Sequence, residues 1–291
     1  MTIQTDVQII PRTGLDFSLS NEIPTFWFGG DAFKTRLFDA HSLLTPAGEG
    51  FFIRCLKAYK NQIRDSRLNL EVEKFILQEG QHTLQHRLSN NRLKAQGIDV
   101  DKLESDQQKE TERFRLRISQ HLGLALTTAY EHITTITSHA LMEHPELFSD
   151  ADPNIFSLYA WHSAEEIEHK SVCFDVMQNV AKVKYPLRVF ALVIATLSFQ
   201  VQVSMLTGKL LRHDGFSFTQ RLALWRRGLK WMYGKNGFTR IQLKHYFAYF
   251  RPHFHPTSFG DMSGYNRWKK IYRLTNDPLI AGKMIQKNDF A

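Results

Sequence analysis

Two Glu-x-x-His pairs, each following a separate glutamate along the chain, constrain the fold of this sequence more than any other feature. Residues three apart on an α-helix lie on one face, so each pair presents a carboxylate and an imidazole together. In a four-helix bundle, two such pairs and two lone glutamates form a carboxylate-bridged site for two metal ions. The pattern therefore predicts an all-α fold in which a four-helix bundle holds a dimetal site. The predicted core ligands are Glu49, Glu79, His82, Glu131, Glu166 and His169.

The spacing of these residues indicates two similar helix pairs, each of which provides half of the site. The separation of Glu49 from Glu131 along the chain nearly equals the separation of Glu79 from Glu166. One Glu-x-x-His pair is a frequent chance match, whereas two pairs with preceding glutamates at matching distances are not. Buried carboxylates and imidazoles are also costly unless they are paired or bind a metal. We therefore prefer a metal site to the alternative, a surface or salt-bridge network.

Three further residues lie on or beside the predicted ligand faces. His162 precedes Glu166 by one helical turn on the same face and is predicted to be a seventh ligand. His86 lies one turn beyond His82 and is either another ligand or a residue at the rim of the site. Histidine ligands usually donate their second ring N–H to an oxygen. Glu165 is therefore a candidate partner for His82 across the bundle.

The ligand set limits the metal and the chemistry. Carboxylates and imidazoles together favour iron or manganese, with zinc as a further option, and we expect two ions, preferably iron. The preferred activity is oxygen-dependent oxidation or oxygenation of a small, lipophilic organic substrate, with O2 as co-substrate and an electron-donor protein as partner. The first alternative is a hydrolase in which two metals share a hydroxide nucleophile. The second alternative is a non-enzymatic metal-binding protein.

Helical periodicity and turn residues divide the chain into four parts. The predicted parts are an N-terminal arm (1–30), the dimetal-binding four-helix bundle (31–184), an apolar helix (185–215) and a basic, aromatic helical region (216–291). Within the bundle, the first helix is expected to run from Asp31 past Glu49, with a kink or restart near Pro46. The other three bundle helices are expected over 68–93, 107–142 and 153–183.

The positive charge is concentrated near the C-terminus. Residues 216–291 hold 14 Lys and Arg against three Asp and Glu, while the whole chain has a net charge of +8. A solvated basic surface is the preferred interpretation, contact with an anionic membrane is the alternative, and specific nucleic-acid binding is not expected. Two cysteines and no apolar run of signal-peptide length favour the cytoplasm, with association with the inner face of the membrane as an option.

The segment Val189–Met205 is almost uncharged. It is marginal in length for a membrane span. It is either a helix buried in the core or in a homodimer, or a helix that faces a membrane. Basic residues flank it, and Trp225 and Trp231 follow among arginines. We therefore expect residues 189–231 to form one continuous hydrophobic surface with a cationic rim.

Three segments carry a resemblance to known proteins. They are Pro46-Ala-Gly-Glu49-Gly-Phe-Phe, Phe75-Ile-Leu-Gln-Glu79-Gly-Gln-His82-x-x-x-His86 and Trp161-His162-Ser-Ala-Glu165-Glu166-x-Glu168-His169-Lys170. Over most of residues 30–250 the sequence resembles a bacterial family of predicted metal-dependent hydrolases of ferritin-like type. This resemblance implies a helical, ferritin-like fold and a metal-dependent activity.

The ligand spacing is also similar to that of the non-haem di-iron N-oxygenases of arylamine metabolism. Their last ligand helix carries His-x-x-x-Glu-x-x-His, which His162, Glu166 and His169 match here. The similarity is confined to this spacing. It implies oxygen chemistry without identifying a substrate.

Overall fold

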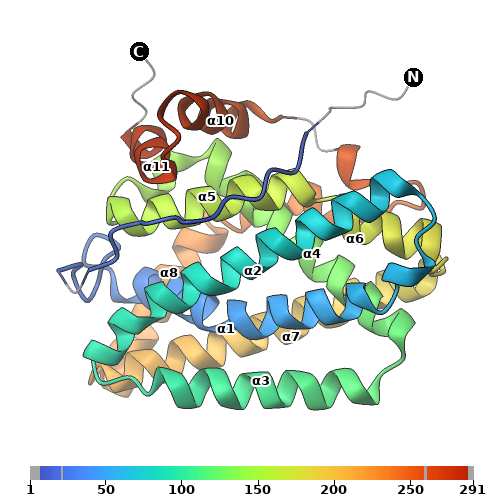
Figure 1. Ribbon diagram of the computed structural model, residues 1–291. Coiled ribbons are helices and arrows are strands. Elements are labelled where there is room, and N and C mark those ends of the chain that lie inside the picture. Colours follow the sequence, from blue (N-terminus) through green and yellow to red (C-terminus); the bar gives the residue numbers. More distant parts are fainter. Residues whose placement is uncertain (1–6, 21, 259–260, 288–291) are drawn as a thin grey trace.

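The computed structural model describes residues 7–20, 22–258 and 261–287, and the fold in these ranges is all-α, as predicted (Figure 1). Four long helices carry the predicted metal ligands. These helices are α1 (Ala32–Lys57), α2 (Ser66–Ala95), α4 (Gln120–Glu143) and α5 (Pro153–His169). α1 packs along α2, and α4 packs along α5. The two helix pairs that the ligand spacing indicated are therefore present.

Polar side chains determine where the bundle helices begin. Each of the four starts after an Asp or a Ser whose side chain accepts a hydrogen bond from a backbone N–H of the first turn. These N-cap residues are Asp31, Asp65, Ser119 and Asp152. α5 also has Pro153 in its first turn, where a missing N–H costs nothing. The starts of these helices are thus encoded locally.

α1 continues through Pro46 rather than restarting there, so the predicted restart is wrong. A proline inside a helix leaves the carbonyl four residues earlier without its usual N–H donor. That carbonyl belongs to Ser42, and the side-chain amide of Asn90 on α2 donates to it at 3.1 Å. A neighbouring helix therefore supplies the hydrogen bond that Pro46 cannot make.

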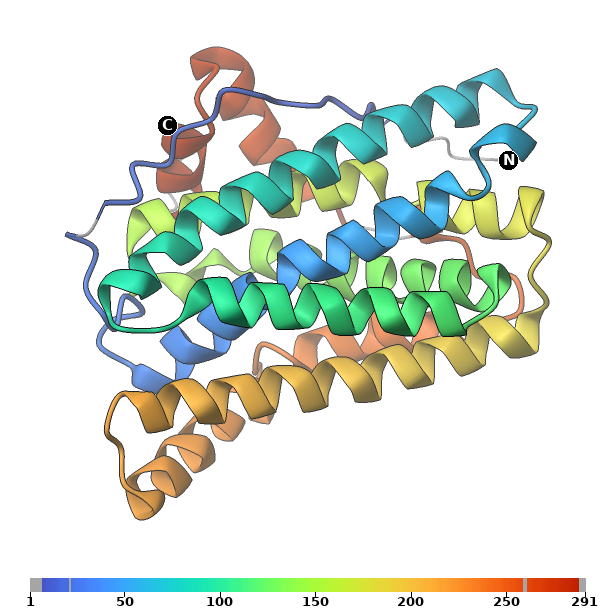
Figure 2. The same cartoon turned by 60° about the horizontal axis from the view of Figure 1, so that its bottom comes forward.

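The single helix predicted over 107–142 is in fact two helices. α3 (Val100–Arg117) ends at Ile118, whose backbone is extended, and α4 begins after the cap Ser119. Val100 is the one buried residue of α3. α3 therefore packs along α1 on the outside of the bundle, as Figure 2 shows.

The helix predicted over 153–183 is also interrupted. α5 ends at His169, and the short helix α6 (Val172–Asp175) leads into a π-helical turn over Val176–Val180. Apolar residues continue to face the core across this break. Hydrophobic periodicity therefore could not reveal where the backbone hydrogen bonding changes.

α7 (Tyr185–His213) packs on α1 and α4 along one side and leaves its other side exposed. Leu197 and Met205, for example, are 59% and 71% exposed. Within the described residues, α7 is the one helix long and apolar enough to cross a membrane, a test that core helices of soluble proteins also pass. Full enclosure by its own chain is excluded. Contact with a membrane or with a second copy stays a prediction, and co-sedimentation with anionic lipid vesicles can test it.

The C-terminal helices pack back onto the bundle. They are α8 (Phe218–Tyr233), α9 (Leu243–Ala248), α10 (Ser263–Thr275) and α11 (Pro278–Lys287). Trp225 of α8 packs edge-on against Phe33 at 4.9 Å between ring centroids, and Trp231 stacks on Phe238 at 5.4 Å. Both tryptophans are half-buried. The tryptophans therefore pack partly into the core, whereas Leu222 and Leu229 of α8 are 62% and 45% exposed. One continuous hydrophobic surface over residues 189–231 stays a prediction.

Candidate metal centre

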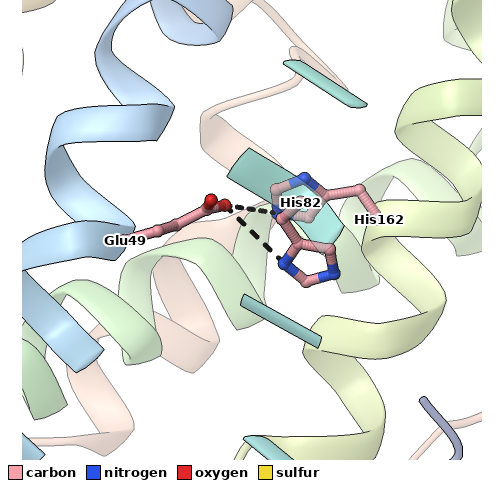
Figure 3. Close-up of side chains that lie close together, drawn as sticks. All are labelled: Glu49, His82 and His162. Atoms are coloured by element: carbon pink, nitrogen blue, oxygen red, sulfur yellow. Dashed lines mark ion pairs between the residues drawn. The ribbon is translucent and has the colours of Figure 1, made fainter. Parts of the chain in front are cut away.

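All seven predicted ligands converge between the four bundle helices, in two groups. In each group, one ligand atom from every residue lies within 4.8 Å of the others. The groups are Glu49, His82 and His162, and Glu79, Glu166 and His169. The seventh residue, Glu131, joins the second group, since its Oε2 is 3.4 Å from Nε2 of His169. Figure 3 shows the first group, with the Glu49 carboxylate facing both imidazoles at 3.6 and 4.0 Å.

Two carboxylates lie between the groups. Oε1 of Glu79 is 3.6 Å from Nδ1 of His82 and 3.3 Å from Nε2 of His169. Oε1 of Glu166 is 3.7 Å from Nδ1 of His82 and 3.6 Å from Nε2 of His169. The same oxygen is also 3.1 Å from Nε2 of His162. Each of these carboxylates therefore faces imidazoles of both groups, as a carboxylate shared by two ions must.

The centre is buried, and several of its polar atoms make no hydrogen bond among the described residues. Glu79, His82 and His169 have no exposed surface. Both oxygens of Glu79 and of Glu131, Nδ1 of His82 and Nε2 of His169 make no hydrogen bond there. Unpartnered buried groups of this kind cost free energy, and carboxylates close together also repel. Divalent metal ions would satisfy this donor set of carboxylates and imidazoles.

The pKa values of the carboxyl groups reflect the crowding. Burial and the nearby Glu79 raise the pKa of Glu49 well above its ordinary value. Burial and Glu131 do the same to the pKa of Glu79, and burial and Glu166 raise the pKa of Glu131 to about 7. Burial also opposes ionisation of Glu166, but His169 and His162 together outweigh burial and hold the pKa of Glu166 well below its ordinary value. Shifts of this kind cluster at functional sites.

A chain of hydrogen bonds determines how His162 presents its ring. Asn90 donates through its amide nitrogen, so its Oδ1 must accept the hydroxyl proton of Ser42, at 2.7 Å. Ser42 Oγ can then accept from Nδ1 of His86 at 2.9 Å. Nε2 of His86 is left to accept from Nδ1 of His162 at 2.8 Å. With Nδ1 of His162 engaged by His86, its Nε2 faces the centre, where it contacts Oε1 of Glu166 at 3.1 Å. With a metal ion bound, this tautomer would direct the lone pair of Nε2 at the ion.

The same bonds distinguish His86 from the other histidines. Both of its ring nitrogens are engaged, one by Ser42 and one by His162. Sequence analysis left two roles open for His86, a ligand or a residue at the rim. The geometry favours the second, because His86 lies behind His162 and holds its ring.

Two other imidazoles also have a polar partner on the side away from the centre. Oε2 of Glu165 is 3.3 Å from Nε2 of His82, and its other oxygen accepts from Arg12 at 2.8 Å. Nδ1 of His169 contacts Oε1 of Gln78 at 3.0 Å. Such outer partners orient histidine ligands and fix their tautomers.

Two threonines that the ligand pattern did not indicate hold the carboxylates. Thr83 donates to Oε2 of Glu49 at 2.8 Å, and Thr134 donates to Oε2 of Glu166 at 2.5 Å. Thr83 lies one turn after Glu79, and Thr134 lies one turn after Glu131. That spacing was a usable signal. The role of Arg12 was not accessible in this way, because it comes from the N-terminal arm.

A cavity of about 360 Å³ extends from the centre toward the outside of the bundle. Glu49, His162 and Glu166 form part of its lining, and α1, α3, α4, α5 and α7 all contribute to its walls. Most of the wall surface is apolar. Six of the apolar lining residues are Leu44, Phe51, Phe52, Ile133, Leu141 and Phe199. A substrate-sized space therefore adjoins the first ligand group.

Comparison with known proteins identifies a family. The family described as predicted metal-dependent hydrolase matches residues 11–260, which contain all seven ligand candidates. No curated protein and no solved structure shows significant similarity to the chain. The comparisons thus support the resemblance to metal-dependent hydrolases and give no support to the resemblance to N-oxygenases. Because the match covers most of the chain, the protein belongs to the family of predicted metal-dependent hydrolases.

Proposed function

We propose that the protein is a hydrolase that uses two metal ions at this centre. The observation that carries the proposal is the pair of ligand groups, joined by Glu79 and Glu166, with unpartnered lone pairs directed between them. The family match favours hydrolysis, which the sequence analysis placed second, over oxidation. The reaction would take place at the end of the cavity that the ligands line.

The residues divide naturally between two ions. Glu49, His82 and His162 would hold one ion, while Glu131 and His169 would hold the other. Glu79 and Glu166, which face imidazoles of both groups, would complete the ligand set. Two bound divalent ions supply Lewis acids and lower the pKa of a bound water toward neutrality.

The rest of the site would keep these ligands in place and exclude solvent. Thr83 and Thr134 fix one oxygen each of Glu49 and Glu166 through hydrogen bonds. Glu165 restrains the His82 ring from behind. The apolar cavity walls would hold the non-reacting part of the substrate and keep bulk water away, which strengthens electrostatic interactions within the site.

Zinc tests the proposal, because it supports hydrolysis but no redox chemistry. Zinc-loaded protein should contain two ions per chain and hydrolyse p-nitrophenyl esters under nitrogen. Glu79→Gln should lose both properties, whereas Glu146→Gln, at an exposed carboxylate, should retain them. One ion or none per chain, or turnover that continues after chelation, would contradict the proposal.

Oxygen chemistry with two iron ions is the second candidate, and the third imidazole, His162, favours it by making the ligand set richer in nitrogen. Substrate oxidation would then need O2 and an electron donor. Anaerobic iron loading followed by exposure to oxygen, monitored by absorption and Mössbauer spectroscopy, tests this candidate. Oxygen consumption coupled to product formation, with no hydrolysis by the zinc form, would establish it over hydrolysis.

A further inference from the structure

Few charged side chains line the cavity beside the metal centre. None of the described residues that line it is Lys or Arg. His41, another lining residue, stays neutral, because burial lowers its pKa to about 4. Glu110 lies at the outer part of the lining and is exposed. Away from the metal centre, an anionic group on the substrate would therefore meet a carboxylate and no cationic side chain.

Several hydroxyl groups in the lining are already occupied by the protein. Thr45 donates to the carbonyl of His41 at 3.0 Å, and Thr137 donates to Oε1 of Gln242 at 3.1 Å. Thr134 donates to Glu166. Since these protons are bonded within the protein, the threonines do not need a polar substrate group. Their methyl groups add to the apolar character of the cavity.

Gln107 of α3 is different from these threonines. It lines the cavity, and its Oε1 is buried without a hydrogen-bond partner among the described residues. A buried amide oxygen of this kind favours a ligand that brings a hydrogen-bond donor. Gln107 thus offers one polar contact inside the cavity, on a helix that carries none of the predicted metal ligands.

The cavity opens between α3 and α7. Glu110 and Phe114 of α3 and Gln202 of α7 belong to the lining and are exposed at the surface. Next to Gln202, Val201 is 55% exposed on the apolar side of α7. A molecule with an apolar chain thus meets apolar side chains at the opening as well as inside.

The volume of the cavity, about 360 Å³, limits the size of this molecule. A group the size of a water molecule takes roughly 30 Å³, so the cavity holds on the order of a dozen non-hydrogen atoms. We infer that the substrate is an uncharged amphiphile of this size, with its reactive polar end at the metal centre and its apolar chain in the cavity between α1, α3, α4 and α7. The position of the reactive end rests on the proposed function, whereas the chemical class rests on the cavity.

Two glycines provide a matched pair of variants for the test. Gly48 lines the cavity and precedes Glu49, and an added Cβ would meet only Phe52 there, at 4.0 Å. Gly80 follows Glu79, is exposed, and has nothing within 4 Å of an added Cβ. Both lie inside helices, so leucine raises helix propensity at both. Gly48→Leu should therefore occupy part of the cavity, and Gly80→Leu should not.

Straight-chain 1-alkanols from hexanol to decanol are the probes, and calorimetric titration of zinc-loaded protein gives their affinities. We expect affinity to rise about three- to fourfold per methylene group. Gly48→Leu should weaken 1-decanol binding by about tenfold or more, while Gly80→Leu should bind it as the wild type does. No dependence on chain length, or full binding by Gly48→Leu, would overturn the inference. Alkanols are not hydrolysed, so binding without any esterase activity would count against the proposed function alone.

A comparison of two alcohols tests the polar contact at Gln107. Gln107→Leu should weaken 1,10-decanediol about threefold or more, by removing the partner of its far hydroxyl, and leave 1-decanol unchanged. Equal losses for both alcohols would show that Gln107 only shapes the cavity, and would overturn this part of the inference.

Discussion

Helix α1 contributes to two of the buried polar clusters among the described residues. In the first, Asp39 accepts from Trp27 at 3.0 Å, from Arg36 at 2.8 Å and from Arg92, while Arg36 also pairs with Asp214 at 2.6 Å. The second is the metal centre, where four carboxylates and three imidazoles meet. Both clusters are almost completely buried. They differ in whether the protein itself supplies the opposite charges.

The first cluster contains two arginines and two aspartates, so its charges balance. The centre contains carboxylates whose oxygens, on Glu79 and Glu131, have no hydrogen-bond donor in the described chain. Burial of charge is tolerated when it is paired and costly when it is not. A buried cluster whose own charges balance therefore stabilises the fold. A buried cluster whose charges do not balance needs a bound ligand to complete it.

The largest expected effect is on the balanced cluster. Asp39→Ala leaves Arg36 and Arg92 buried without their shared acceptor, and should lower the free energy of unfolding by about 3–5 kcal/mol. The loss should be the same with and without metal, as measured by denaturant unfolding. The control is Asp101→Ala, at an ion pair on the surface of α3. It should change the free energy of unfolding by less than about 0.5 kcal/mol. An unchanged Asp39→Ala protein would break the comparison.

At the metal centre, Glu79→Gln should act on the metal-loaded protein alone. Burial and Glu131 raise the pKa of Glu79, which favours its neutral form in the metal-free protein, and Gln has nearly the same shape and polarity as that form. At a metal concentration 100 times the dissociation constant, the wild type should gain about 2.7 kcal/mol from binding, and the variant should lose that gain. Thermal unfolding with and without metal measures both values. If the variant lost as much stability without metal as with metal, Glu79 would have a structural role like that of Asp39.

The stability of the metal-free protein should fall as the pH rises from about 4.5, the ordinary carboxyl pKa, through about 7, the raised pKa of Glu131. The pKa values of Glu49 and Glu79 are raised well above their ordinary value, and that of Glu131 is raised to about 7. Groups with raised pKa stabilise the fold below their unfolded-state pKa, and this contribution is lost as the pH passes through the folded-state value. Each group contributes at most about 1.4 kcal/mol per pH unit. Chemical unfolding at several pH values measures the slope, which should flatten in metal-loaded protein.

The smallest effect concerns the residues that orient His162. Ser42→Ala removes the acceptor of His86 and should weaken metal binding about tenfold, while His162→Ala should weaken it more and leave the other ligand group occupied. In a double-mutant cycle, Ser42→Ala should have little further effect in the His162→Ala background. Competition with a chromophoric chelator gives the affinities. Additive losses would mean that Ser42 does not act through His162.

Local sequence rules were sufficient to predict the helices and the helix faces that carry the ligands. Periodicity over a few turns, an Asp or a Ser at each helix start, and the i, i+3 spacing of Glu79 and His82 depend only on neighbours along the chain. The family match and the all-α fold agree with that level of analysis. The number of metal ions, their identity and the reaction stay predictions.

Other features became visible only in three dimensions, because they depend on partners that are remote along the chain. Asn90 supplies the hydrogen bond that α1 lacks because of Pro46, and Arg12 of the N-terminal arm donates to Glu165. Both α3 and α4, which are separate helices on either side of Ile118 and Ser119, line the cavity. The sequence by itself determined which residues face the centre, since helical spacing is local. Tertiary structure decided which of them are held by other side chains, since packing alone brings distant segments within hydrogen-bonding distance.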